Sequence, residues 1–455
     1  RLLPSISVET ESADKEYRLS AKSTALEYAG EHIGGALWQY FEGQGDAERA
    51  LAAMKDASRY TRGHLSRDAV RALYGGAVTL SASRMDMARS CHFAYFMRYG
   101  LKARERTGAG FDAPQIGTFV HDVMEHTLRQ AKECGGLHTL SKDKLHALVR
   151  ASIEEYIDRV LPDLSEKSAR FRYLFNRLCA TVERIMDEVS EELQGSDFEP
   201  LAFELEFGAD GQLPAITIRE ENGTARVVGK VDRVDGWLHD GKLYLRVVDY
   251  KTGKKSFDLA ELRYGLGLQM LLYLFTLKEE GQMLFGGHEI VPAGVLYTPA
   301  REPMLRCARD TEPEKIEKAL KKELRRSGMV LEDPAVLQAM EHSALESPCY
   351  LPIAVKRDGA VTGSLASAEQ LGKLSKYVDH ILHEITQEVF AGNIDADPYA
   401  RTPQQSACTY CEFASACHFE NGCGSDRMEY IKATKNDEFW QYIDEANGEG
   451  AHENG

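Results

Sequence analysis

Two aspartates and a lysine beside one predicted β-hairpin are the residues of this chain best suited to chemistry. Asp-Gly at positions 240–241 separates two β-rich runs, which is typical of a two-residue hairpin turn. If the turn is that tight, counting back along both strands places Asp232 opposite Asp249 with the side chains on one face. Lys251 follows Asp249 by two residues and therefore shares that face.

This pair of acids suggests a cation site. Two carboxylates so close in a largely apolar sheet repel each other, and a cation between them would remove the conflict. Hard oxygen ligands on a rigid hairpin suit Mg2+ or Mn2+, and the Lys251 ammonium suits an anionic reacting group such as a scissile phosphate. The alternative is a looser turn, a register slipped by one residue, and acids that point to solvent.

Two predicted helices carry polar residues that could face the same site. His121 comes early in a helix, after Gly117, where its ring could turn inward to a metal, although such a histidine is more often a packed or capping residue. Gln269 and Tyr273 lie one turn apart in a helix otherwise dominated by leucine. A polar pair amid so much hydrocarbon needs partners, so it either satisfies a hydrogen bond in the core or faces a site.

Three cysteines near the C-terminal end have the spacing of metal ligands. The group Cys408-x2-Cys411-x5-Cys417 lies in a loop rich in small and polar residues, and in a reducing compartment such a group favours metal binding. Spacing does not decide the fourth ligand, because Cys423 and His418 are near in sequence, whereas Cys91 lies 317 residues upstream of the group. The other cysteines are isolated and are expected to be ordinary thiols, at positions 134, 179, 307 and 349.

The elements that must position these residues predict a mixed α/β core. Strand-like patterns cover residues 201–207, 227–234, 243–250 and 291–297. Helical patterns cover residues 115–195, 266–277, 313–328 and 367–391. The part of the first helical stretch from Ser141 to Gly195 is long enough to be a helical insertion into that core.

The two ends of the chain differ from this core. Residues 1–78 are polar and helical in character and are expected to end a preceding domain, since the chain starts at Arg1 without a methionine. Residues 431–455 form an acidic tail, with six acidic residues and no lysine or arginine from Asp437 onward, which predicts an unstructured segment. No Gly-rich phosphate loop ending in Gly-Lys-Ser/Thr is present, so no nucleotide-binding motif is visible.

Composition narrows the class of protein. The 455 residues are 43% hydrophobic without an apolar stretch near the ~18 residues of a membrane span, which excludes membrane integration. Nine cysteines are too few for a secreted disulfide scaffold, and no secretory signal is visible, so the cytoplasm is the expected location. The net charge of -16, taken alone, argues against a nucleic-acid partner.

One segment reverses that charge. Residues 59–106 contain ten lysines or arginines against three acidic residues, a local balance of +7, and six tyrosines or phenylalanines interleave with them. Basic and aromatic residues together suit backbone phosphates and stacked bases, although a solvated helix face is an equally good interpretation. Net charge therefore averages over regions of opposite sign.

Taken together, the motifs resemble the RecB-type nucleases of the PD-(D/E)XK superfamily, and in particular the nuclease regions of B subunits in AddAB-type helicase-nuclease complexes. The resemblance covers about residues 79–425. It rests on six motifs in order: Ser81-Ala82-Ser83-Arg84 with Cys91 to Phe96, Ile116-Gly117 with His121, Gly229 to Arg233, Asp249 to Gly253, Gln269-x3-Tyr273, and Cys408-x2-Cys411-x5-Cys417. One departure is His92, where the family usually has proline after the first cysteine.

The resemblance implies a role for each matching residue. His121, Asp232, Asp249 and the backbone carbonyl of Tyr250 would hold Mg2+ or Mn2+. Lys251 would orient the attacking water and stabilise charge on the phosphate, while Gln269 and Tyr273 would position the strand or Lys251. The four cysteines of the family would hold a structural [4Fe-4S] cluster, at Cys91, Cys408, Cys411 and Cys417, which favours Cys91 over Cys423.

The resemblance also implies a function. Residues 79–430 would form the nuclease domain of an ATP-dependent deoxyribonuclease that degrades one strand at double-strand DNA ends for homologous recombination repair. Its expected partners are DNA, as double-strand ends and single strands, and an AddA-type motor protein with which it would form a heterodimer; residues 1–78 would end a helicase-like region. The alternatives are a CRISPR-associated iron-sulfur exonuclease, which the long insertion disfavours, and an inactive DNA-binding scaffold of the same fold.

Overall fold

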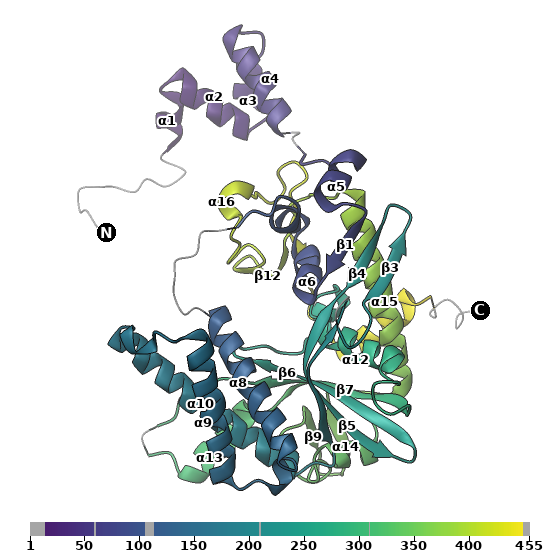
Figure 1. Cartoon of the computed structure of the whole chain (residues 1–455). Coiled ribbons are helices and arrows are strands. Elements are labelled where there is room, and N and C mark those ends of the chain that lie inside the picture. Colours follow the sequence, from purple (N-terminus) through teal and green to yellow (C-terminus); the bar gives the residue numbers. More distant parts are fainter. Residues whose placement is uncertain (1–13, 59–60, 105–112, 209–210, 309, 449–455) are drawn as a thin grey trace.

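A six-stranded mixed sheet forms the centre of the computed structural model, which describes residues 14–58, 61–104, 113–208, 211–308 and 310–448 (Figure 1). The strand order is β11-β8-β7-β6-β5-β2, built from β2 Glu199–Phe207, β5 Gly229–His239, β6 Lys242–Lys251, β7 Glu289–Pro299, β8 Ser327–Leu331 and β11 Leu365–Ala366. The pairs β6–β7 and β8–β11 are parallel and the others are antiparallel. The predicted PD-(D/E)XK-type α/β architecture, with its mixed sheet, is confirmed.

The hairpin between β5 and β6 has the predicted register. Residues 240–241 form the two-residue turn, and both have positive φ, at 49° and 77°, as a type I′ turn requires. Pairing starts at His239–Lys242 and continues without a shift to Arg233–Val248. The tight turn, with its left-handed backbone, thus sets the alignment of both strands as far as this last pair.

Helices cover both faces of the sheet (Figure 1). On one face lie α8 Ala113–Glu133, α9 Lys142–Val160 and α10 Ala169–Gln194, and on the other lie α12 Gln269–Glu280 and α15 Ala368–Ala391. Each presents apolar residues at helical spacing, as at Phe119, Val120, Val123 and Met124 of α8, all 0% exposed. Helices α9 and α10 are the predicted insertion.

The N-terminal helices have a small core of their own. Helices α1 Asp14–Leu19, α2 Lys22–Glu31, α3 Ala36–Phe41 and α4 Asp46–Ser58 stand apart from the sheet in Figure 1. Ala25, Ala29, Trp38, Phe41 and Leu51 are buried among them. By contrast, Val70 of α5 Arg67–Tyr74 and Val78 of β1 Ala77–Leu80 belong to the main core. That residues 1–78 end a helicase-like region stays a prediction.

A second sheet, which the sequence patterns did not predict, lies beside α15. Strand β1 pairs with β4 Gly223–Val227, which pairs with β3 Ile216–Glu220. After β1 the chain forms α6 Ala82–Ser90, α7 His92–Tyr95 and a π-helical turn Phe96–Gly100. The remaining elements are α11 Leu259–Arg263, α13 Pro313–Glu323, α14 Pro334–Met340, β9 Ile353–Val355, β10 Val361–Gly363, β12 Tyr399–Thr402, β13 Gln405–Ser406, α16 Ala414–Cys417 and β14 Glu429–Tyr430, with short 3-10 turns at Leu137–Thr139 and Leu164–Glu166.

The acidic tail is not unstructured throughout. Helix α17 spans Asn436–Ala446, and Phe439, Trp440 and Ile443 on it are buried in the main core. The prediction from charge was wrong here because three apolar residues at helical spacing provide enough buried surface to order an acidic segment. Residues 449–455 lie outside the described residues.

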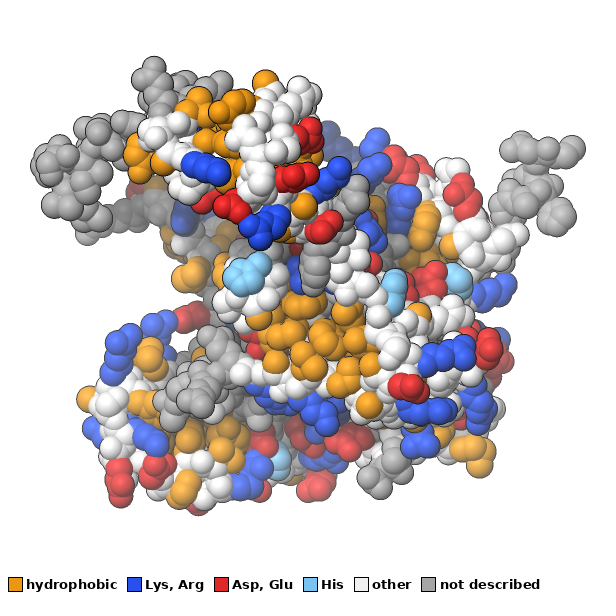
Figure 2. All heavy atoms as spheres, turned by 90° about the horizontal axis from the view of Figure 1, so that it is seen from above, with side chains coloured by type: hydrophobic (Ala, Val, Ile, Leu, Met, Phe, Trp, Pro, Cys, Tyr) orange, Lys and Arg blue, Asp and Glu red, His pale blue; other side chains and the backbone are white. Residues whose placement is uncertain are grey.

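The basic segment 59–106 does not present its arginines as free cations. Arg62 pairs with Asp426, Arg89 with Glu384 and Glu388, and Arg98 with Glu412; Arg59 and Arg106 lie outside the described residues. These pairs bind the segment to the C-terminal part of the chain instead of leaving it for phosphates. From above, acidic and basic side chains are interspersed around a central group of hydrophobic ones (Figure 2). No helix in the described ranges is long and apolar enough to span a membrane.

Candidate active site

Strands β5 and β6 stop pairing just before the two predicted acids, and the site forms in this fork. The ladder ends at the Arg233–Val248 pair. One residue further, Asp232 Oδ2 accepts a hydrogen bond from the backbone N–H of Tyr250 at 2.9 Å, so a side chain replaces the strand partner. Asp232 and Asp249 therefore lie together at the predicted register, but in an opened fork instead of a continuous ladder.

A break in the neighbouring strand β2 accompanies the fork. Glu204 has a φ of 50°, in the left-handed region that a non-glycine residue rarely adopts. Phe203 lies under Arg129 of α8, whereas Phe207 packs edge-on against Tyr273 of α12. Regular alternation would place both phenylalanines on one face. The strand therefore changes faces at Glu204, beside Asp232.

Helix α8 brings His121 into the fork. Its Nε2 lies 2.8 Å from the carbonyl oxygen of Tyr250, and its Nδ1 lies 3.3 Å from Asp232 Oδ2. Burial alone lowers the pKa of His121, but the hydrogen bond and the negative charge of Asp232 outweigh it and raise the pKa to about 9. The ring thereby links a carboxylate on β5 to a carbonyl on β6.

Asp249 and Lys251 form an ion pair next to it. Lys251 Nζ lies 2.7 Å from Asp249 Oδ2, and Asp249 is only 3% exposed. Burial, followed by the charge of Asp232, raises the pKa of Asp249 to about 6, although Lys251 opposes this shift. The raised pKa shows that the two carboxylates disfavour each other's charge, which is the conflict that the sequence predicted.

Gln269 and Tyr273 border the fork from α12. Gln269 Nε2 donates to Tyr273 Oη at 3.2 Å, and that hydroxyl also bonds the backbone of Lys230. Both residues, with Lys230, line a cavity of about 670 Å3. The pair therefore satisfies its own hydrogen bonds and also faces a cavity, so the two sequence interpretations are compatible.

Glu204 is a carboxylate at the fork that sequence reasoning missed. Glu204, His121 and Asp232 each offer a ligand atom within 4.8 Å of the others. Glu204 also pairs with Lys230 at 2.6 Å, and burial raises its pKa. The alternating pattern of β2 gives Glu204 the appearance of a solvent-facing strand residue, so no sequence signal separates it from Glu206.

These groups fit a hard divalent cation. Oxygen and imidazole donors suit Mg2+ or Mn2+. Ligand bonds of about 2.0–2.1 Å place neighbouring ligand atoms roughly 3 Å and opposite ones roughly 4 Å apart. The 3.3 Å separation of His121 Nδ1 and Asp232 Oδ2, and the 4.8 Å limit on the group with Glu204, are close to that requirement.

The four cysteines of the motif line one cavity. Cys91, Cys408, Cys411 and Cys417 border a cavity of about 630 Å3, whereas Cys423 is exposed and is absent from its lining. All nine cysteines are free thiols. Burial raises the pKa of Cys91 to about 12, which an electropositive cluster bound to the thiolate would offset. Four thiolate donors in one cavity fit an iron-sulfur cluster.

The segments that carry these cysteines are fastened to each other. Arg62 Nη2 donates to the carbonyl of Cys417 at 2.8 Å. His92, the departure from the family pattern, donates its backbone N–H to Asp397 at 3.0 Å and places Nδ1 2.6 Å from the same carboxylate. A proline has no N–H and could not make the first of these bonds. His92 thus adds a link between both ends of the core.

Comparison with known proteins agrees with this geometry. Residues 79–418 match the PD-(D/E)XK nuclease superfamily, and the chain belongs to that superfamily. The match contains the fork, helix α12 and all four cysteines of the cavity.

Curated relatives share one name, that of the B subunit of ATP-dependent helicase/deoxyribonuclease. The protein from Ruminiclostridium cellulolyticum is 30% identical over 421 residues, and that from Acetivibrio thermocellus is 32% identical over 412 residues, each covering 90% of this chain. The protein from Thermoanaerobacter pseudethanolicus is 31% identical over 386 residues, or 84% of the chain. The chain spans about a third of these relatives' length, at 36%, 35% and 33%.

Proposed function

We propose that this chain is the metal-dependent exonuclease region of the B subunit of a helicase-nuclease, which hydrolyses phosphodiester bonds of one strand at double-strand DNA ends for homologous recombination repair. The observation that carries the proposal is the convergence of His121, Asp232, Asp249 and Lys251 in one fork, inside a region that belongs to a nuclease superfamily. The printed name of the relatives supports the DNA substrate.

The ligands of the cation would be His121, Asp232, Asp249 and the Tyr250 carbonyl, with Glu204 as an additional carboxylate. A bound Mg2+ or Mn2+ would lower the pKa of a water molecule and offset charge on the phosphate. Asp232 holds the N–H of Tyr250, and His121 lies against the carbonyl of the same residue. The chain's own contacts therefore orient these ligands before substrate enters.

Lys251 would act on the reacting phosphate. Its ammonium is held 2.7 Å from Asp249 and 5.8 Å from the centre of the Tyr297 ring, and it is only partly exposed. A cation fixed in this way can donate to a phosphate oxygen and orient the attacking water, with little reorganisation during the reaction. Gln269 and Tyr273 would position the strand or Lys251 from α12.

Two cavities border the fork and would accommodate a single strand. One is the cavity beside Gln269, Tyr273 and Lys230. The other, of about 210 Å3, is strongly basic: one carboxylate, Glu323, faces six cationic residues, Lys251, Lys254, Lys255, Arg301, Lys322 and Arg325. Phosphate groups favour such positive surface, so the chain can bind DNA locally despite its net charge of -16.

The rest of the proposed assembly involves a cluster and a partner. Cys91, Cys408, Cys411 and Cys417 would hold a [4Fe-4S] cluster as a structural staple between distant segments. The relatives are named as one subunit of an enzyme, which supports a heterodimer with an AddA-type motor protein that would carry most of the ATP-driven unwinding. Such an assembly would work in the cytoplasm.

An end-labelled single strand tests the function. The 455-residue chain should shorten it in Mg2+ and not in excess chelator. Asp249→Asn should slow cleavage by on the order of 10²–10³-fold, the usual loss when one group that stabilises the transition state is removed, while DNA binding remains. Asp240→Asn makes the same change at the exposed hairpin turn and should leave the rate unchanged. Chelator-resistant cleavage, or full activity of Asp249→Asn, would refute the assignment.

A further inference from the structure

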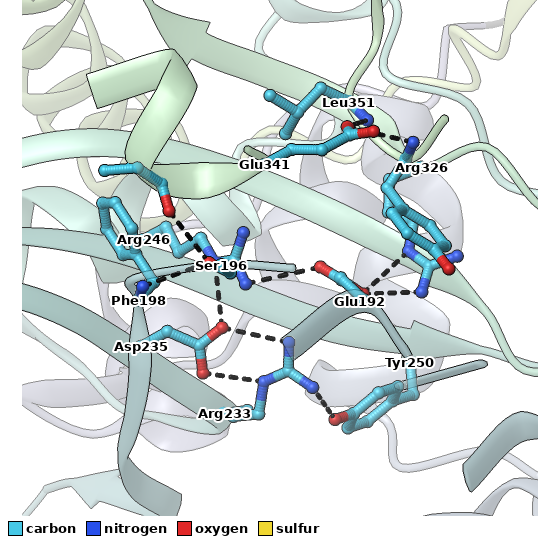
Figure 3. A network of polar contacts seen from close by, with 12 residues as sticks. Glu192, Ser196, Phe198, Arg233, Asp235, Arg246, Tyr250, Arg326, Glu341 and Leu351 are labelled. Carbon is cyan, nitrogen blue, oxygen red and sulfur yellow. Dashed lines mark hydrogen bonds and ion pairs between the residues drawn. The ribbon is translucent and has the colours of Figure 1, made fainter. Parts of the chain in front are cut away.

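A buried network of charged side chains lies behind the candidate active site, against helix α10 (Figure 3). Alternation along β6 places the Tyr250 side chain on the face opposite to Asp249 and Lys251. The ring therefore points away from the fork, although the backbone of Tyr250 is part of it. There the Tyr250 hydroxyl accepts a hydrogen bond from Arg233 Nη1 at 2.6 Å.

Arg233 is itself held by a chain of ion pairs. Its Nε and Nη2 contact the two carboxylate oxygens of Asp235 at 2.8 and 3.0 Å. Asp235 also contacts Arg246 Nε at 2.9 Å, and Arg246 continues to Glu192 of α10 at 3.4 Å. Glu192 in turn binds Arg326 at 2.6 Å. The side chains of Arg233, Asp235 and Arg246 are 0% exposed, so none can exchange its partner for water.

We propose that Arg233 is a positioning residue for the metal site and acts through the Tyr250 hydroxyl to orient the Tyr250 carbonyl. The inference rests on the proposed function, in which that carbonyl is a metal ligand. Tyr250 is held at two points, its N–H by Asp232 and its hydroxyl by Arg233. With both fixed, the peptide plane keeps its carbonyl directed toward His121, which lies 2.8 Å away.

A purely structural role would not require the hydroxyl. Buried ion pairs contribute little net stability compared with apolar packing, and the pairs among Arg233, Asp235, Arg246 and Glu192 do not involve Tyr250. What the hydroxyl adds is a link from this rigid network to a residue of the fork. Partners behind a metal ligand commonly set its orientation and, through it, the affinity for the metal.

Tyr250→Phe in the 455-residue chain removes this link and leaves the carbonyl in place. Mn2+ binding is measured from the electron paramagnetic resonance signal of the free ion, without DNA or turnover. The dissociation constant for Mn2+ should rise on the order of tenfold. Tyr350→Phe is the matched control, because the Tyr350 ring lies 4.7 Å from the Arg326 guanidinium at the other end of the network. It should leave the constant unchanged.

The outcomes separate the two proposals. Equal weakening by both variants, or no weakening by Tyr250→Phe, would overturn the positioning role. Asp249→Asn is measured in parallel; if the wild-type chain binds Mn2+ no better than that variant, the metal site itself is absent and the proposed function fails first. If circular dichroism shows that Tyr250→Phe is unfolded, Arg233→Lys replaces it and must show the same selective loss of Mn2+ binding.

Discussion

The carboxylate of Asp232 accepts a hydrogen bond from the backbone N–H of Tyr250 at 2.9 Å, where β5 and β6 separate. This hydrogen bond takes the place of the next rung of the ladder. It brings a carboxylate of one strand to the backbone of the other, beside His121 from α8. Because one hydrogen bond joins both strands, the groups around it are expected to respond together when any of them is changed.

Glu204→Gln should weaken metal binding. Its carboxylate lies within 4.8 Å of ligand atoms of His121 and Asp232, so its loss should raise the Mg2+ concentration for half-maximal cleavage on the order of tenfold. Glu206→Gln is the control, because Glu206 also contacts Lys230, at 3.5 Å, but is not part of the metal group. A Mg2+ titration of both variants measures the difference, and equal titrations would remove Glu204 from the site.

Lys251→Met should reduce catalysis without preventing metal binding. The ammonium is positioned to act on the phosphate and is not a metal ligand, so its removal should lower kcat by roughly 10²–10³-fold. Single-turnover cleavage and Mn2+ binding are measured on the same preparation. A variant that cleaves normally, or that loses Mn2+ along with activity, would contradict the assigned role.

Lys322→Gln should weaken DNA binding through the basic cavity. Each phosphate of a single strand that is no longer neutralised by a cationic side chain lowers the slope of log affinity against log salt by about 0.7. Lys318→Gln on the same helix is the control, because Lys318 is exposed but does not line the cavity. Fluorescence anisotropy with a labelled strand in Ca2+, at several salt concentrations, gives both slopes, and identical slopes would exclude the cavity from the DNA path.

Cys91→Ser should abolish the cluster, whereas Cys423→Ser should not. Only the first of these thiols lines the cavity with Cys408, Cys411 and Cys417. Protein purified anaerobically should contain about four iron and four sulfide per chain in the wild type and in Cys423→Ser, and little in Cys91→Ser. Stoichiometric zinc without sulfide would instead indicate a zinc site.

Glu192→Gln should cost stability at neutral pH and less at low pH. Although burial raises the pKa of Glu192, the charges of Arg326, Arg246 and Arg233 outweigh it and lower the pKa to about 2. A carboxyl with a lowered pKa stabilises the fold above its unfolded pKa of about 4.3, and that contribution is lost as pH falls toward the folded value. The expected cost near pH 7 is about 3 kcal/mol. Urea unfolding at pH 7 and pH 3 should show the difference from wild type shrinking; a constant difference would contradict the charged state.

The chain's order of residues was enough to predict the hairpin and the acids on it. An Asp-Gly turn between β-rich runs specifies a register through local backbone geometry, so Asp232 and Asp249 could be aligned without tertiary information. The same local rules located the main helices and strands. They failed for α17, where Phe439, Trp440 and Ile443 are buried against distant elements that no local pattern reveals.

Tertiary structure alone decided which groups meet. The left-handed backbone of Glu204 and the opening of the ladder bring a third carboxylate to the fork, and neither has a sequence signal. Spacing left Cys91 and Cys423 as equal candidates, and only the packing of two segments 317 residues apart places Cys91 in the cavity. The physical reason is that local propensities act over a few residues, whereas burial and charge pairing select among contacts that the whole fold makes possible.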